Sequence, residues 1–294
     1  MNIFLVLNPT AGRYKGTKAI QKAAPLLENR GIQCEVRVSK FPGHAVQLAQ
    51  NFDPAKYEGI VAVGGDGTLF EVLNGVLKKN HHFDLPIGQI PVGTGNSFIK
   101  DLGIHSIEDA VDKIVSGKTR KVDVGFFQYP GGEYYFINLL GTGFVANVAH
   151  RAGKYKSLGS LSYVLGVFEE VACLKPVPLE MTIDGNVYHR DYIFTEICNS
   201  TKTGGNMIMA PDAKIDDGFL DIILLNDISK YNLLKVFPQI YKGTHIHDSH
   251  AEIFKGREIK IVTETPQRLT PDGEILGTTA IKVSIFPSHI NMFC

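Results

Sequence analysis

The sequence predicts a two-domain protein with an α/β domain on a parallel sheet at residues 1–123 and a mostly β, antiparallel, sandwich-like domain at residues 124–284. The length of 294 residues suits two domains, with one large domain as the alternative. Short β-branched runs alternate with helical patterns in the first part, and strands paired around turn signals follow. The C-terminal strand, including residues 285–294, is compatible with either domain.

The first part of the chain repeats a strand, loop and helix unit. The expected strands are residues 3–7, 34–38, 60–63 and 85–90. Apolar side chains recur at helical spacing after the first three strands. These helix faces comprise Ile20, Ala23 and Leu27; Ala45, Leu48, Ala49 and Phe52; and Leu69, Val72, Leu73, Val76 and Leu77. Such alternation predicts a parallel sheet with helices on both faces and its loops gathered at one edge.

The second part is expected to form three hairpins and one helix. The turn signals are residues 130–132, 184–186 and 255–257. They separate strands expected at residues 124–129 and 134–140, at 179–183 and 187–198, and at 251–254 and 258–262. A helical pattern over residues 161–171 interrupts the strands, and Ile281, Val283 and Ile285 alternate along a last strand.

Composition excludes several classes of protein. The 30 Lys and Arg residues balance 30 Asp and Glu residues, and only 20% of the chain is charged. We therefore expect neither nucleic-acid binding, which needs a basic field, nor extensive disorder. The four cysteines form no CxxC pair, which favours a reducing cytoplasm. No apolar stretch approaches the roughly 18 residues that cross a bilayer, so membrane contact is expected to be peripheral.

Three glycine-containing loops follow the first, third and fourth strands. They are residues 8–12 (NPTAG), 64–68 (GGDGT) and 91–96 (PVGTGN). Glycines let backbone N–H groups approach an anion, and the following helix N-termini favour negative charge. Any one loop alone is explained equally well as a plain turn, but the three together predict a phosphate site. None of them is a Walker A or a dinucleotide-binding motif.

Asp66 lies among these glycines, where a carboxylate is most useful when a divalent cation bridges it to phosphates. Thr68 and Glu71 fit a capping box at the start of the following helix, so both have a structural alternative.

The loops NPTAG, GGDGT and PVGTGN, in this order and spacing, resemble the diacylglycerol kinase catalytic domain family, which includes bacterial lipid kinases, sphingosine kinases and ceramide kinases. The resemblance continues through residues 136–144, 214–221 and 272–274 and covers essentially the whole chain. It implies ATP and Mg²⁺ as cofactors and phosphorylation of a lipid hydroxyl.

The resemblance also assigns residues. The implied ATP-binding residues are Asn8, Pro9, Thr10, Gly12, Ser39, Gly64, Gly65, Asp66, Gly67, Thr68, Glu71, Thr94, Gly95 and Asn96. A structural magnesium site is implied at Asp217, with the backbone carbonyls of Lys214 and Phe219.

For catalysis, the resemblance implies Glu274 as the general base, with Asp272 beside it. Without the resemblance, Asp272-Gly273-Glu274 is more simply a β-turn. Because Glu274 and Asp66 are far apart in the sequence, their joint action requires an active site in a cleft between the two domains.

Ser97 departs from the family pattern, because many bacterial members have Asp at this position. The substitution removes a second carboxylate near the metal and leaves the identity of the lipid open, since sphingosine-kinase-like members also lack an acid there.

We expect a cytoplasmic, Mg²⁺-dependent lipid kinase that associates transiently with a membrane surface and transfers the γ-phosphate of ATP to diacylglycerol or a related lipid. A soluble-substrate kinase such as NAD kinase and a non-catalytic nucleotide- or lipid-binding regulator are the alternatives. A homodimer is also left open.

Overall fold

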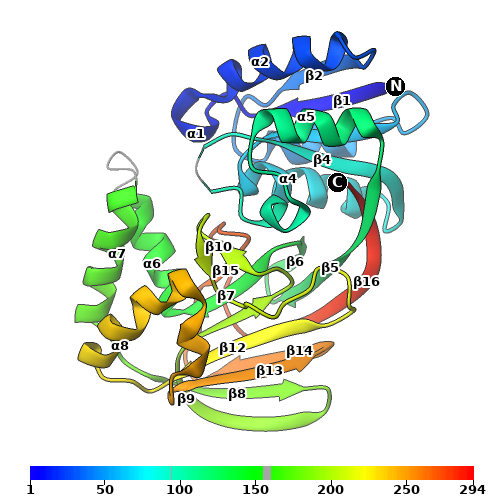
Figure 1. Ribbon diagram of the computed structural model, residues 1–294. Helices are drawn as coiled ribbons and strands as arrows, with labels where there is room; N and C mark the ends of the chain where they lie inside the picture. Colours follow the sequence, from blue (N-terminus) through cyan, green and yellow to red (C-terminus); the bar gives the residue numbers. More distant parts are fainter. Residues whose placement is uncertain (94, 155–159) are drawn as a thin grey trace. The chain divides into compact units, whose positions relative to one another are not determined.

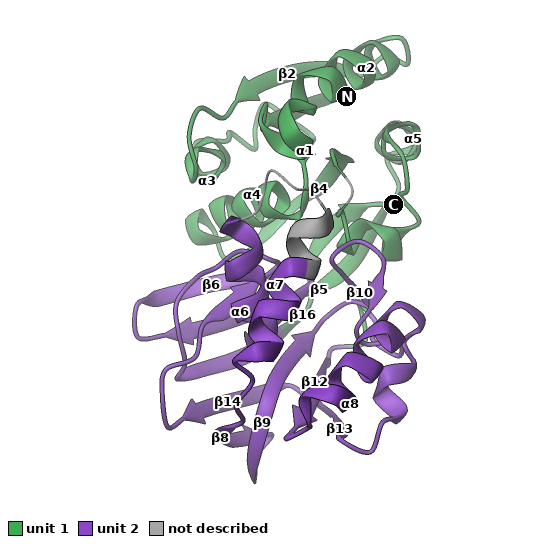
Figure 2. Cartoon of the chain, turned by 90° about the vertical axis from the view of Figure 1, so that its left-hand side faces the viewer, with its two compact units in different colours: residues 1–124, 215–217, 286–294 green, residues 125–214, 218–285 purple. Residues whose placement is uncertain are grey.

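The computed structural model describes residues 1–93, 95–154 and 160–294, which form two compact units (Figure 2). Unit 1 comprises residues 1–124, 215–217 and 286–294, and unit 2 comprises residues 125–214 and 218–285. Two long strands contribute to both units. β5 (Thr119–Tyr129) begins in unit 1, and β16 (Ile281–Phe293) ends there.

Unit 1 is built on a parallel sheet in the order β16, β4, β3, β1, β2 (Figure 1). The strands that lie wholly in this unit are β1 (Asn2–Leu7), β2 (Gln33–Val38), β3 (Gly59–Gly64) and β4 (Phe83–Pro91). β1 pairs with β2 and β3, β3 pairs with β4, and β4 pairs with the end of β16, all in parallel. Every residue of β3 is buried, as expected for a central strand covered on both faces.

Helices cover both faces of this sheet. They are α1 (Ala11–Tyr14), α2 (Gly16–Glu28), α3 (His44–Gln50), α4 (Asp66–Lys79), the 3₁₀ helix η1 (Phe98–Leu102) and α5 (Ile107–Ser116). α2 packs against α5 on one face, and α3 packs against α4 on the other (Figure 2). The apolar face predicted for α4 is buried, which confirms the predicted α/β arrangement.

Unit 2 is mainly antiparallel. Its strands are β6 (Gly132–Phe136), β7 (Leu139–Gly143), β8 (Val177–Ile183), β9 (Asn186–Cys198), β10 (Lys202–Thr203), β11 (Met207–Ile208), β12 (Leu220–Asn226), β13 (Ala251–Gly256), β14 (Glu258–Thr263) and β15 (Leu269–Pro271). β9 is the organising strand, because its first half pairs with β8 and its second half pairs with β7 and β12.

Helices cover part of this unit. They are α6 (Phe144–Ala152), α7 (Ser160–Ala172), α8 (Lys230–Val236) and the 3₁₀ helices η3 (Phe237–Lys242) and η4 (Thr244–His247). The buried apolar residues form two clusters. One lies between strands and contains Tyr192, Ile197 and Leu224, and the other lies between strands and helices and contains Phe194, Ile223 and Leu233.

Two of the three predicted hairpins are confirmed, namely β5 with β6 and β8 with β9. The third is wrong, because β13 pairs with β12 whereas β14 pairs with β8 and β16. The chain changes neighbours at Arg257, whose backbone N–H donates to the Asp184 carboxylate in the β8–β9 turn over 3.0 Å. The Asp184 carboxylate, distant in sequence, thus contacts the chain at the point where the expected hairpin is replaced by other strand pairings.

The strand predicted over residues 134–140 is also wrong in its extent. It breaks into β6 and β7 because the backbone N–H groups of residues 137–139 turn away to the carboxylate of Asp272. In the part of the chain that the structure describes, no helix combines the length and the apolar character needed to cross a membrane.

Candidate functional site

The first two glycine loops of unit 1 are joined by side chains. Asn8 follows β1, and its Nδ2 donates to Thr68 Oγ1 in the first turn of α4 over 3.2 Å. Asn8 Oδ1 accepts from the backbone N and from Oγ1 of Thr10, at 3.1 and 2.8 Å. Asn8, Thr10 and Thr68 therefore form one connected group, as expected for loops at the same edge of a parallel sheet.

The third loop is attached by a residue that the sequence did not single out. Gln89, buried in β4, donates through Nε2 to the carbonyl of Gly64 and to Asn96 Oδ1, both at 3.0 Å. Asn96 in turn donates to the carbonyl of Gly93 over 3.3 Å. A polar residue inside a buried parallel strand is the signal that could have identified Gln89.

Gly12 and Gly95 leave little room for a side chain where these loops approach each other. Gly12 has φ +57°, and a Cβ there would lie 2.9 Å from the backbone N of Gly93. A Cβ at Gly95 would lie 3.3 Å from Asp66 Oδ2. The N-cap of α4 is Gly65, and no side chain of the described residues caps this helix. The first N–H groups of such a helix suit an anion such as phosphate.

Asp66 is the carboxylate at this edge of the sheet. Both of its oxygens accept from the backbone N–H of Ser97, at 2.9 and 3.1 Å. Burial raises the pKa of Asp66 above its usual value, although hydrogen bonds from Ser97 and the nearby Lys100 act in the opposite direction. A cation beside Asp66 would favour the ionised carboxylate.

The described residues fit Mg²⁺ held jointly with phosphate rather than by protein alone. They contain no group of three or more His, Cys, Asp or Glu side chains that could hold a metal ion. Mg²⁺ is commonly bound by one or two carboxylates and the phosphates of a substrate, and Asp66 would supply the carboxylate in that arrangement.

The capping box predicted for Thr68 and Glu71 is not formed. The N-cap of α4 is Gly65 rather than Thr68, and Thr68 contacts Asn8 instead. Glu71 accepts from the backbone N–H of Gly43 over 3.0 Å and from that of Ala45 over 3.1 Å, so it holds the start of α3.

The segment before α3 carries Ser39, which is buried at the end of β2. The backbone N–H of Ser39 donates to the carbonyl of Leu7 over 2.8 Å, which brings this residue next to the first loop. Pro9 and Gly67 lie within the first and second loops. Thr94 lies outside the described residues.

In unit 2, Asp272 and Gly273 occupy a tight turn with φ values of +47° and +88°. The carboxylate of Asp272 is buried and accepts from the backbone N–H groups of Ile137, Asn138 and Leu139 at 3.0, 2.9 and 3.1 Å. Glu274 closes the turn, because its N–H donates to the carbonyl of residue 271 over 2.8 Å, and it is exposed. Asp272 is therefore arranged as a support for the turn that presents Glu274.

Asn199 reinforces the same region and was missed by the sequence reasoning. Its Nδ2 donates to the carbonyl of Ile137 over 2.8 Å. Its backbone N–H donates to the carbonyl of Asn138 over 2.9 Å. Asp66 lies in unit 1 and Glu274 in unit 2, so their meeting at one substrate stays a prediction.

The predicted structural metal site lies in the segment that joins β11 to β12. Residues 215–217 group with unit 1, where Asp216 accepts from Arg120 over 2.7 Å, whereas Lys214 and Phe219 group with unit 2. The ring of Phe219 lies 4.5 Å below the guanidinium of Arg257. Asp217 is the one carboxylate of the predicted set, so a cation there would depend on backbone carbonyls.

Unit 2 contains two cavities that share Val145, Glu196 and Thr203 as lining residues. The outer one, of about 300 Å³, is also lined by Thr270 and Gly273 from the region of the Asp272 turn and by Ala149 and Ala152 of α6. The inner cavity shares Glu196 and is walled mainly by apolar side chains. They are Phe144, Val145, Phe194, Met207, Met209, Ile223, Leu225, Leu233, Val236, Phe237, Ile240 and Ala251.

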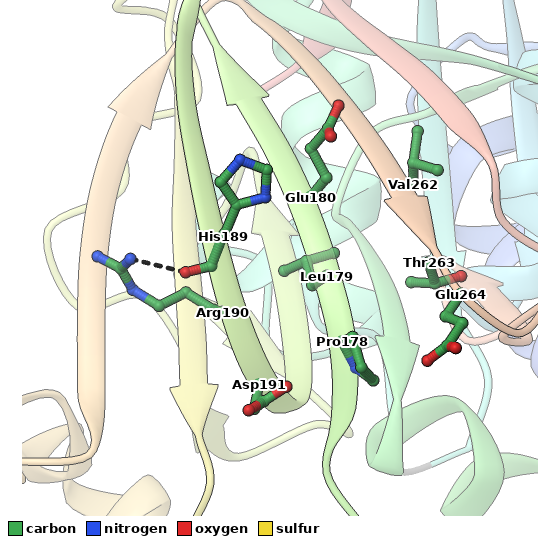
Figure 3. A pocket seen from close by; sticks show the side chains of 9 residues that line it. All are labelled: Pro178, Leu179, Glu180, His189, Arg190, Asp191, Val262, Thr263 and Glu264. Carbon is green, nitrogen blue, oxygen red and sulfur yellow. Dashed lines mark hydrogen bonds between the residues drawn. The ribbon is translucent and has the colours of Figure 1, made fainter.

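A separate hollow of about 440 Å³ lies over β8, β9 and β14 (Figure 3). Its charged side chains project in different directions, and the guanidinium of Arg190 is already bound by the carboxylate of Glu252 at 2.7 and 2.9 Å. It contains none of the predicted site residues, so we do not assign it a role in catalysis.

Comparison with known proteins identifies the family. Residues 2–127 match the diacylglycerol kinase catalytic domain, and residues 138–294 match the YegS C-terminal NAD kinase beta sandwich-like domain. A diacylglycerol kinase of Bacillus subtilis is 30% identical over 277 residues, covering 93% of this chain and 89% of that protein. The chain belongs to the diacylglycerol kinase family.

Members of this lipid kinase family are ATP-dependent phosphotransferases. The relatives include diacylglycerol kinases and a sphingosine kinase. A sphingosine kinase 1 of Arabidopsis thaliana is 28% identical over 331 residues, covering 94% of this chain and 68% of that protein. The crystal structure of a putative diacylglycerol kinase from Bacillus anthracis superposes with a TM-score of 0.82 at 27% identity, covering 99% of this chain and 96% of that one. The predicted lipid kinase class is thereby confirmed, along with the predicted fold class.

Proposed function

We propose that this member of the diacylglycerol kinase family transfers the γ-phosphate of ATP to the hydroxyl of diacylglycerol or a related lipid, with Mg²⁺ as the cation. The observation that carries the proposal is the joining of three glycine loops around Asp66, through Asn8, Gln89 and Ser97. This arrangement provides backbone N–H groups for phosphates and one carboxylate for a cation.

The nucleotide and its cation would supply the phosphoryl group and neutralise its charge. The residues of the chain would bind and orient the nucleotide and its cation. The loops around Gly12 and Gly65 would surround the phosphates, Asp66 would hold the cation, and Ser39 would contribute to the nucleotide site from the end of β2. Glu71 acts indirectly, because it fixes the start of α3.

Glu274 is proposed as the general base that accepts the proton of the lipid hydroxyl as that oxygen forms its bond to phosphorus. Asp272 holds the turn and is therefore a positioning residue. Glu274 and Asp66 would act on the same substrate in the proposed cleft. The proposed structural magnesium would be held by Lys214, Asp217 and Phe219, where the chain leaves unit 1 for unit 2.

A lipid acceptor requires contact with a bilayer. We therefore propose a cytoplasmic protein that associates transiently with the membrane surface. The cysteines are free thiols, which suits a reducing compartment. A homodimer remains part of this proposal, and measurement of the mass in solution tests it.

The experiment is transfer of labelled γ-phosphate from ATP, with Mg²⁺, to diacylglycerol, phosphatidylglycerol, sphingosine, ceramide and NAD in parallel. We expect label in one lipid and loss of that label in Glu274→Gln. Label in NAD alone would establish a soluble-substrate kinase instead. ATP binding without transfer to any acceptor would favour a regulatory protein and contradict the proposal.

A further inference from the structure

Glu196 is a buried carboxyl group, and one of its two oxygens has no hydrogen-bond partner among the described residues. It lies on β9, where it faces Gly141 of β7 and Ile223 of β12 across the sheet. The side chain is 3% exposed, and its Oε2 has no hydrogen-bond partner within the described part of the chain. Buried polar groups are nearly always hydrogen-bonded, and an unsatisfied one destabilises a fold. Its presence here needs an explanation other than stability.

The position of this carboxyl is fixed by its neighbours. A Cβ on Gly141 would lie 2.7 Å from Glu196 Oε2 and 2.9 Å from Thr270 Cγ2, so the absence of a side chain at Gly141 makes the room that the carboxyl occupies. Thr270 Oγ1 is a second buried polar atom without a partner among the described residues, and Thr270 lines the outer cavity together with Glu196.

Glu196 lines both cavities, together with Val145 and Thr203. The outer cavity reaches Gly273, next to the proposed general base. Among the described residues, the polar ones that line the inner cavity are Glu196, Thr203 and His245. A molecule that occupied both would place a polar group at Glu196, its apolar part among the side chains of the inner cavity, and its other polar end near the turn of Gly273.

The chemistry of this junction suits a neutral oxygen. Burial raises the pKa of Glu196 to about 8, so its carboxyl carries a proton at neutral pH and is an O–H donor. Burial lowers the pKa of His245, so that imidazole is neutral as well. The cavity is then uncharged, and a neutral acceptor such as an ester carbonyl matches it better than an ammonium group does.

The inner cavity is narrow, because its volume of about 20 Å³ corresponds to about one water molecule. An acyl chain must therefore widen it. Met207 and Met209 form part of its wall, and methionine side chains adapt readily because they are unbranched and have several rotatable bonds.

We propose that Glu196 is a specificity-determining residue that donates a hydrogen bond to an ester carbonyl oxygen of the acceptor lipid, whose acyl chain enters the inner cavity. The inference rests on the proposed lipid kinase function and adds to it the recognition of an ester. Glu196 takes no part in the transfer of the phosphoryl group.

The test compares two acceptors of equal chain length, dioctanoylglycerol with ester links and dioctylglycerol with ether links, which lack the carbonyl oxygens. In the wild type we expect kcat/KM to be about 10-fold or more higher for the ester, because a buried hydrogen bond is lost with the ether. Glu196→Gln should keep most of this preference, since its amide still donates. Glu196→Leu should bring the ratio close to one, through a higher KM for the ester.

Met207→Leu is the matched control, because it changes the apolar wall that both acceptors contact and should leave the ratio unchanged. Persistence of the full ester preference in Glu196→Leu would overturn the inference, as would equal use of both acceptors by the wild type. Equal losses in Glu196→Gln and Glu196→Leu, with sphingosine as the best acceptor, would show that an ammonium group binds there instead and would also overturn it. Absence of transfer to every lipid would refute the proposed function itself, which these other outcomes leave intact.

Discussion

The Asp272→Asn substitution tests the support beneath the proposed catalytic turn. In the wild type, Asp272 Oδ1 accepts from the backbone N–H groups of Asn138 and Leu139, and Oδ2 accepts from that of Ile137. In the variant, the amide oxygen can retain the first two bonds. The amide nitrogen cannot accept the third, so the N–H of Ile137 loses its acceptor.

The magnitude follows from burial. Ile137 is 1% exposed, so water cannot replace the lost acceptor. A buried unsatisfied donor costs about 1–3 kcal/mol, and the two remaining bonds weaken because the carboxylate charge is gone. We expect unit 2 to lose about 2–4 kcal/mol of unfolding free energy, or roughly 5–15 °C in its thermal transition. Displacement of Glu274 should lower kcat by about 10- to 100-fold.

Asp184 provides a matched control within the same unit. Asp184 and Gly185 form a turn with φ values of +46° and +87°, nearly equal to those of Asp272 and Gly273. The Asp184 carboxylate also accepts from backbone N–H groups, those of Arg257 and Glu258, but its surroundings are exposed. Asp184→Asn should therefore lower the free energy of unfolding by less than about 1 kcal/mol, because water can accept from any backbone N–H that loses its bond to residue 184.

Calorimetric unfolding of both variants is the assay, with phosphate transfer measured on the same samples. If Asp272→Asn were as stable as Asp184→Asn, the three buried hydrogen bonds would not support the turn as argued. If it were destabilised yet kept full kcat, the turn would be structural and Glu274 would not depend on it.

Three further substitutions test other parts of the account. Glu71→Gln should raise the KM for ATP several-fold with little change in kcat, because the N–H of Gly43 before α3 loses a charged acceptor. An unchanged KM would contradict the role of Glu71 in fixing the start of α3. Gly12→Ala should lower the affinity for ATP at least 10-fold, because the added Cβ would lie 2.9 Å from the backbone N of Gly93. Isothermal titration calorimetry measures this affinity. Normal binding would show that the first and third glycine loops are not closely joined. Glu196→Leu should raise the free energy of unfolding, by about 1 kcal/mol at pH 5 and by on the order of 4 kcal/mol at pH 8. The gain grows with pH because Glu196 keeps its proton in the folded state up to a pKa of about 8, whereas the unfolded state loses that proton above about pH 4.5. A gain independent of pH would show that Glu196 is ionised in the fold.

Local patterns were sufficient to predict most of unit 1. The strands and helices there follow from hydrophobic periodicity, and the joining of the three loops follows from parallel topology alone. The roles of Glu71 and Gln89 could not be predicted in the same way. Glu71 binds N–H groups of another helix, and Gln89 joins two loops from inside a strand, so both depend on contacts that are set by tertiary packing.

Unit 2 was less predictable because its strand pairing is set by contacts between residues far apart in the chain. β14 pairs with β8 and β16 rather than with β13, and Asp272 breaks the strand expected over residues 134–140. Glu196 was invisible for a related reason, since a single acidic residue in a strand usually faces solvent, and only the fold shows that this one is buried between two cavities.

We propose that Asp66 in unit 1 and Glu274 in unit 2 serve one transfer reaction. The most direct test is the rate of label transfer from ATP to dioctanoylglycerol by the wild type, Asp66→Asn and Glu274→Gln, each first shown to be folded by its thermal transition. We predict that each variant loses at least about 100-fold in kcat/KM while keeping the wild-type melting temperature within a few degrees. A folded variant of either residue that retained transfer within about threefold of the wild type would contradict the claim.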